Sequence, residues 1–189
     1  DISPGFSRPG VSVYSTHMYY FDCYADGTRS RFFDMNNHAP GGGGTTGEWR
    51  IKYRISDKLP LSILLASRTF GRDGYIDQAG NLHRAYSTYI ELGYDFVLGE
   101  NWQLDARVGI TPAKSLYTAY QGNFAVCHIG LNLQKSWTFS TTSSISPTLT
   151  TFANVMLNPY QVTKDNLILP IEQAGNQKLN MNIGCQVAL

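Results

Sequence analysis

The chain of 189 residues carries 15 basic and 14 acidic side chains, and its net charge of +1 gives no electrostatic basis for binding nucleic acid. Charged residues make up 15% of the sequence, below the roughly 25% of typical soluble domains. A hydrophobic content of 42% argues against disorder, and 12 Tyr, 9 Phe and 18 Gly favour a sheet protein over a helical one. We expect one domain over residues 1–189.

Alternation of apolar and polar residues with a period of two is the dominant pattern. It is strictest in 48–56, where every second residue from Trp49 to Ile55 is apolar and the residues between them are charged. In 124–134 the pattern places Ala125 and Cys127 on the apolar face and His128 on the polar face. Eight strands are predicted, in chain order at 11–24, 48–56, 61–70, 85–96, 102–111, 124–134, 138–157 and 179–189.

The predicted connections alternate between short turns and long loops. Short turns are expected at 56–60, 98–101 and 135–137. Long loops are expected near 25–47, which contains four consecutive glycines, and near 71–84, 112–123 and 158–178. In an antiparallel meander this order places the short turns at one end of the sheet and the long loops at the other.

Two architectures have such alternating strands. A soluble sandwich or lipocalin-like barrel turns its apolar face inward, whereas an up-and-down transmembrane β-barrel turns it toward lipid and encloses the polar face. Strands near the 9–11 residues that cross a bilayer, loops that are long at one end only, and aromatic residues near strand ends favour the membrane barrel. The predicted lipid-facing and girdle aromatics are Trp49, Tyr53, Tyr94, Phe96, Trp102, Trp137 and Phe139.

The opposite faces of the strands would line a narrow interior. Charges enclosed there have to pair, because an unpaired buried charge is costly. We interpret this set mainly as a structural salt-bridge plug, with a narrow charged pore or a proton path as the functional alternative. The predicted network contains Glu48, Arg50, Lys52, Arg54, Arg68, Glu91, Asp95, Asp105 and Arg107.

Catalytic and metal-binding motifs are absent from the sequence. Cys23, Cys127 and Cys185 are widely spaced and indicate neither a disulfide framework nor a zinc site. The histidines have no spacing that places a nucleophile beside a base, and His128 is expected to bond Asn132 or a neighbouring carboxylate. We therefore predict no catalytic residue, metal or cofactor, and no enzymatic activity.

Several segments form a characteristic set: residues 84–96, 104–112 and 129–135, together with Tyr117 and the Asn158-Pro159 pair that ends a predicted strand. As a set they resemble a group of uncharacterised small outer-membrane β-barrel proteins of Bacteroidetes. The resemblance covers roughly 47–189 and implies a closed antiparallel barrel in the outer membrane, but no established activity. Members carry additional N-terminal strands, so the count of about eight strands would rise to 10–12 if such strands precede this sequence.

The sequence thus predicts a structural or interaction component of a Gram-negative outer membrane, with membrane lipid as one partner and other outer-membrane or periplasmic proteins as further partners. A subunit of a larger outer-membrane complex fits this description. A small porin-like channel and a soluble lipid-binding barrel are the alternatives. The apolar residues Leu167, Ile168, Leu169 and Ile171 of loop 158–178 are candidates for a protein contact, and the alternative is that this loop folds over the mouth of the barrel.

Overall fold

The computed structural model describes residues 5–8, 10–19, 35–36, 45–139, 147–160 and 179–188, and all structural statements concern these ranges. Within them the chain forms strands and one short 3-10 helix, η1 (Leu116–Thr118). The strands are β1 (Gly5–Arg8), β2 (Val11–Tyr19), β3 (Thr45–Arg54), β4 (Leu61–Gly71), β5 (Gly74–Ile76), β6 (Leu82–Arg84), β7 (Thr88–Val97), β8 (Trp102–Thr111), β9 (Ala125–Thr138), β10 (Thr148–Leu157) and β11 (Leu179–Ala188).

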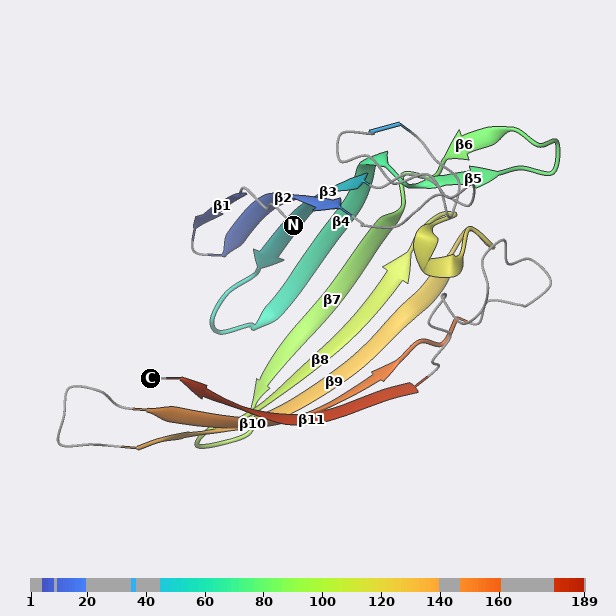
Figure 1. The fold of residues 1–189 in the computed structure, drawn as a ribbon. Helices are drawn as coiled ribbons and strands as arrows, with labels where there is room; N and C mark the ends of the chain where they lie inside the picture. Colours follow the sequence, from blue (N-terminus) through green and yellow to red (C-terminus); the bar gives the residue numbers. More distant parts are fainter. Residues whose placement is uncertain are drawn as a thin grey trace.

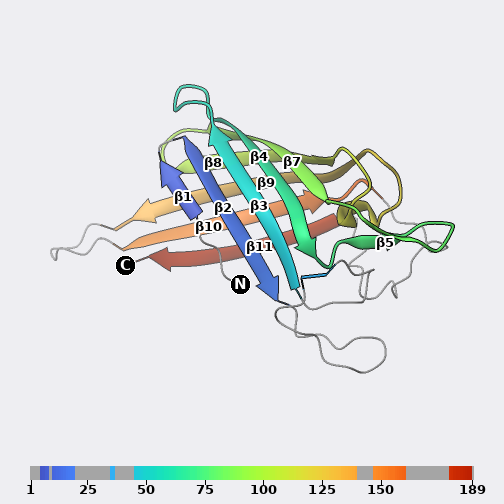
Figure 2. The ribbon, with the colours of Figure 1, turned by 90° about the horizontal axis from the view of Figure 1, so that it is seen from above.

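Nine strands form one sheet in the order β1-β2-β3-β4-β7-β8-β9-β10-β11, and all neighbours in it are antiparallel. The sheet curls, so that β1–β4 and β10–β11 lie on opposite sides of a concave space bounded by β7–β9 (Figure 1). Seen from above, β2 and β3 cross over β10 and β11 (Figure 2). The predicted all-β antiparallel fold is confirmed, but no pairing of β1 with β11 closes the sheet among the described residues.

The N-terminal region contains one strand more than predicted. A turn at Gly10, which has a φ of 83°, joins β1 to β2 as a hairpin in which Arg8 pairs with Val11. Positive φ is a conformation that glycine adopts without steric cost. The short strands β5 and β6 form a separate hairpin inside the predicted loop 71–84.

The short turn predicted at 135–137 is wrong. Strand β9 continues to Thr138 and pairs with β10 up to Thr148, so the connection runs over 139–147 instead. The hydroxyl groups of Ser136 and Thr150 lie 2.9 Å apart across this pair. Short and long connections therefore do not alternate as strictly as predicted.

The predicted faces of strand 124–134 also need correction at its beginning. Gly109 pairs with His128 and Ile110 pairs with Val126, so Cys127 is the extra residue of a β-bulge. The bulge shifts the alternation by one position. Ala125 and Cys127 are consequently buried, while Ile129 remains on the exposed apolar face.

Candidate functional site: the polar inner face

The two faces of the sheet have opposite chemistry. Large apolar side chains cover the convex face, and examples such as Ile183 (88% exposed) and Leu92 (52% exposed) are open to the surroundings. Of the described hydrophobic residues, only the small side chains of Ala66, Ala125 and Cys127 are buried. Domains folded in water bury their large apolar side chains, so this sheet has the inverse arrangement.

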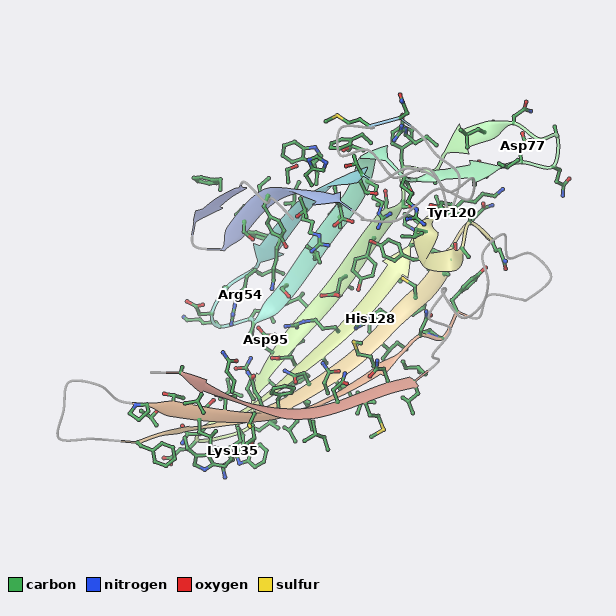
Figure 3. The ribbon with its side chains drawn as sticks, viewed as in Figure 1. Arg54, Asp77, Asp95, Tyr120, His128 and Lys135 are labelled. Carbon is green, nitrogen blue, oxygen red and sulfur yellow. The ribbon has the colours of Figure 1, made fainter. Side chains whose placement is uncertain are left out.

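Charged side chains lie on the concave face. Arg54 and Asp95 point into the concave space from β3 and β7, together with His128 from β9 (Figure 3). Glu48 and Arg68, which pair across β3 and β4, are 1% and 8% exposed. All nine residues of the predicted network occupy positions of this face in the register of the sheet.

Arg107 is the centre of one ion-pair cluster. Its Nη2 donates to Asp95 Oδ1 at 2.7 Å, and its Nε lies 3.9 Å from Glu91 Oε1. Asp95 also lies 3.5 Å from Arg54 Nη1. Gly93 pairs with Arg107 across β7 and β8, and a Cβ atom on Gly93 would overlap the guanidinium group. The missing side chain therefore lets Arg107 lie flat across the strand between its two carboxylate partners.

Glu48 organises a second cluster nearer the loop end of the sheet. Its carboxylate accepts a hydrogen bond from Arg50 Nε, and its Oε2 lies 4.0 Å from Arg68 Nε. The Arg50 guanidinium lies 6.0 Å from the ring centroid of Tyr14, at the outer limit for a cation–π contact. An almost completely buried carboxylate thus has two cations beside it, as the cost of burying a charge requires.

Two members of the predicted network are not ion-paired with any described residue. Asp105 instead accepts hydrogen bonds from the amides of Gln103 at 2.6 Å and Asn132 at 3.1 Å. Lys52 is exposed on the concave face. Asn132 donates to Asp105 instead, and His128 forms no hydrogen bond with Asn132 or with a carboxylate among the described residues, so the predicted bond of His128 to either partner is wrong. The His128 ring lies over Gly130, where a Cβ atom would meet Nε2 at 2.6 Å.

Tyrosines extend the polar face toward the long loops. The Tyr89 hydroxyl donates to Glu91 Oε2 at 2.6 Å, and its ring lies 5.2 Å from the ring of Tyr117 in η1. Burial, followed by the negative charge of Glu48, raises the pKa of Tyr117 to about 12, so its hydroxyl stays protonated at neutral pH. The loop that contains η1 therefore reaches down to the charge network at this end of the sheet.

A buried polar cluster joins this loop to the loop that precedes β7. Asp73, fully buried, accepts hydrogen bonds from the backbone N–H of Ser87 at 2.7 Å and from its hydroxyl at 2.5 Å. The Tyr120 hydroxyl donates to the same carboxylate at 3.3 Å. The backbone N–H of Leu116 donates to Ser87 Oγ at 2.8 Å. Burial raises the pKa of Asp73, and the hydrogen bonds from Ser87 oppose this effect.

The β5–β6 hairpin carries a second, exposed carboxylate. Asp77 accepts hydrogen bonds from the backbone N–H groups of Asn81 at 2.8 Å and Ala79 at 2.9 Å, and its other oxygen lies 2.8 Å from His83 Nε2. The bonds from Asn81 and His83 lower the pKa of Asp77 to about 2. The Tyr75 ring of this hairpin stacks 6.0 Å from the Tyr120 ring.

Sequence reasoning missed the Asp73 cluster. Its partners Ser87 and Tyr120 lie 14 and 47 residues from Asp73 along the chain, and neither a motif nor the alternating pattern connects them. A buried carboxylate in a predicted loop has no composition signal of its own. The cluster becomes visible only when the sheet brings the two loops to the same rim.

The predicted aromatic girdle lies largely at the rim of the short turns. Tyr53, Tyr94, Phe96, Trp102, Trp137 and Phe139 are near the strand ends at this rim, whereas Trp49 lies in the middle of β3. Tyr94 and Phe96 have ring centroids 4.5 Å apart. The predicted contact residues Leu167, Ile168, Leu169 and Ile171 lie outside the described residues, as do Cys23 and His38.

The described ranges hold no group of three His, Cys, Asp or Glu side chains that could bind a metal ion. They also contain no helix long and apolar enough to cross a membrane. Comparison of the chain with protein-family models, curated proteins and solved structures found no match. The family resemblance inferred from the sequence therefore stays a prediction.

Proposed function

We propose that the chain is a transmembrane antiparallel β-barrel of the bacterial outer membrane, with its apolar face toward lipid and its charge network enclosed. The observation that carries this proposal is the inverse arrangement of the sheet: exposed Ile, Leu and Trp side chains on the convex face, paired Arg, Asp and Glu side chains on the concave face. In water such a face would be an apolar patch far larger than monomeric soluble proteins expose.

Strand length supports the proposal. Strands β3, β7, β8, β10 and β11 have 10 residues each and β4 has 11. Ten residues span about 34 Å along a strand, and a tilt of about 45° reduces this to about 24 Å. This height agrees with the apolar band of about 25 Å on outer-membrane barrels.

The proposal requires that the edge strands β1 and β11 each pair with a further strand, so that the barrel closes. An open edge in hydrocarbon would leave a row of backbone N–H and C=O groups without hydrogen bonds, at several kcal/mol for each group. Bacterial barrels formed by single chains have even strand numbers, so we propose a closed barrel of 10–12 strands that includes the nine-stranded sheet.

The pairing of charges on the concave face supports a structural or interaction role in the envelope. Ion pairs centred on Arg107 and Glu48 cross the concave face, and Tyr89 and Tyr117 meet at its loop end. Salt bridges of this kind hold neighbouring strands together and compensate the charges that the proposed barrel would enclose. We therefore propose a component of the outer membrane that contacts other envelope proteins through its long loops, including as a subunit of a larger assembly.

Vesicle flotation tests the membrane barrel. The full chain is refolded in the presence of phospholipid vesicles and centrifuged in a density gradient, and the floating fraction is run on denaturing gels with and without boiling. We expect the protein to float and to migrate as a folded band until it is boiled. Protein that remains in the buffer fraction without lipid would contradict the proposal and favour the soluble lipid-binding barrel.

Purification from native membranes tests the proposed assembly. In mild detergent we expect the protein in a particle larger than its own micelle-bound monomer, with defined partners in constant ratio. A particle that contains this chain alone would contradict the assembly role and leave the barrel itself unaffected.

A small channel is the second candidate, because some cations on the concave face remain accessible. The side chains of Arg50 and Arg54 are 37% and 45% exposed, and Lys52 is exposed as well. Planar bilayers would then show discrete conductance steps, and Arg54→Glu would shift the selectivity toward cations. Absence of steps from protein that floats with vesicles would exclude the channel.

A further inference from the structure

One charged side chain stands out on the apolar face. On strands β3, β4 and β7–β11, the described residues of this face are apolar, aromatic, small or uncharged polar, with the exception of Lys135. Lys135 pairs with Trp102 on β8 and Thr151 on β10, so these three side chains share the convex face. Lys135 interrupts the apolar alternation of β9, and the turn predicted at 135–137 begins at this residue.

Two indole rings hold the ammonium group of Lys135. Its Nζ lies 4.9 Å from the ring centroid of Trp102 and 5.0 Å from that of Trp137. The side chain lies among aromatic rings on the outside of the curled sheet (Figure 3). No described carboxylate forms an ion pair with it, so the two π faces are its observed partners.

The surroundings of Lys135 offer further hydrogen-bond donors. The hydroxyl of Thr151 lies directly across the ladder and has no hydrogen-bond partner among the described residues. The same holds for the indole N–H groups of Trp102 and Trp137 within the described part of the chain. The ammonium group of Lys135, the hydroxyl of Thr151 and the two indole N–H groups thus share one area of the convex face without an anion that could accept their hydrogen bonds.

Lys135 and its two tryptophan partners lie near the rim of the short turns. Trp102 is the first residue of β8, directly after the turn at 98–101, and Trp137 is next to the last residue of β9. In a membrane barrel this rim lies at the level of the lipid headgroups, where Trp is enriched. The anion available at that depth is the phosphate of a lipid.

We propose that Lys135, Thr151, Trp102 and Trp137 form a binding site for the headgroup phosphate of an anionic phospholipid in the leaflet at the short-turn rim. The proposal rests on the proposed membrane barrel. The ammonium and the Thr151 hydroxyl donate to the phosphate oxygens, while the indoles fix the lysine along the barrel wall and contact the glycerol and upper acyl chains. Thr151 and the two indoles make this a site of defined geometry rather than a general attraction to negative charge.

The test uses the full chain folded in detergent micelles, with phosphatidylglycerol and phosphatidylcholine as competing probes in native mass spectrometry. We expect about a five-fold preference for phosphatidylglycerol, the effect of one lysine near an anionic surface. Lys135→Gln should abolish this preference. Lys58→Gln, which removes the same charge from the turn at 56–60 on the same rim, should keep it. Vesicle flotation of all three proteins establishes first that each one inserts.

The outcomes separate this proposal from the one on which it rests. Failure of the unmutated chain to float would overturn both. Normal flotation with equal lipid preference in Lys135→Gln and the unmutated chain would overturn the lipid site alone. An equal loss in Lys58→Gln would show general surface attraction and would also overturn the site, as would full competition by free glycerol phosphate, which carries the headgroup chemistry without acyl chains.

Discussion

Removing Arg107 should destabilise the sheet measurably, and the structure gives the size of the effect. At 2.7 Å from Asp95, the guanidinium gains about 6 kcal/mol of Coulomb attraction at an effective dielectric constant of about 20. Desolvation of the two partly buried groups offsets most of this gain. Breaking a buried pair by removing one partner costs about 3–5 kcal/mol in general, because a charge is left uncompensated.

The cost should be lower here because the partners of Arg107 have other contacts. In Arg107→Met, Asp95 keeps Arg54 at 3.5 Å and Glu91 keeps the hydroxyl of Tyr89 at 2.6 Å. We therefore expect a loss of about 2–3 kcal/mol in the free energy of unfolding. A double-mutant cycle with Asp95→Asn should give a coupling energy of about 1–2 kcal/mol.

Urea-induced unfolding from vesicles, followed by tryptophan fluorescence, measures these free energies. Lys52→Met is the matched control, because Lys52 lies on the same face without an ion pair to a described residue, and its unfolding free energy should change by less than about 0.5 kcal/mol. Additive effects of the Arg107 and Asp95 substitutions would refute the reasoning, since they would mean that the two charges act independently.

Two further substitutions and a pH titration test the local structure. Gly93→Ala should cost about 1–3 kcal/mol of unfolding free energy, because the new methyl group displaces the Arg107 guanidinium; an unchanged midpoint in urea would contradict this packing. Ser87→Ala removes the hydroxyl that bridges the two loops and should lower the opening free energy there by about 1–3 kcal/mol, seen as faster amide hydrogen exchange. NMR titration should place the pKa of Asp73 above the ordinary value and that of Asp77 at about 2. Protonation of Asp73 therefore stabilises the loop junction at low pH, and this contribution is lost as the pH rises through the raised pKa of Asp73. Ionised Asp77 stabilises its hairpin above pH 4, and this contribution is lost as the pH falls toward 2.

The alternating pattern was sufficient to predict most strands because each has one apolar and one polar face. Strand β8 matches the predicted range 102–111 at both ends, β4 ends one residue later than predicted, and β11 begins at the predicted residue 179. The same alternation placed all members of the charge network on one face. Side-chain direction follows strictly from position within a regular strand, so no partner information is needed for this step.

The errors occur where a residue departs from the period of two. A bulge beside Gly109 moved Cys127 out of register, and single-sequence alternation contains no signal for such an insertion. The turn predicted at 135–137 begins at Lys135, a charge that lies in the apolar register of β9. Its two tryptophan partners, one of them 33 residues distant in the chain, explain why β9 continues instead.

The sequence also could not predict which ion-pair or hydrogen-bond partner each residue of the charge network has. Asp105 carries the same charge as Asp95, but its neighbours across the ladder include Asn132, so it bonds amides where Asp95 bonds arginines. The choice depends on which residues the register places opposite each carboxylate. Register across non-local strands cannot be read from one sequence.

Fluorescence quenching in vesicles tests most directly whether the apolar face contacts lipid. The chain has three tryptophans, Trp49, Trp102 and Trp137, and the register places all of them on the convex face. Phospholipids brominated on their acyl chains should quench most of the emission, and aqueous iodide should quench little of it. Strong quenching by iodide with no effect of the brominated lipids would contradict the inverted sheet.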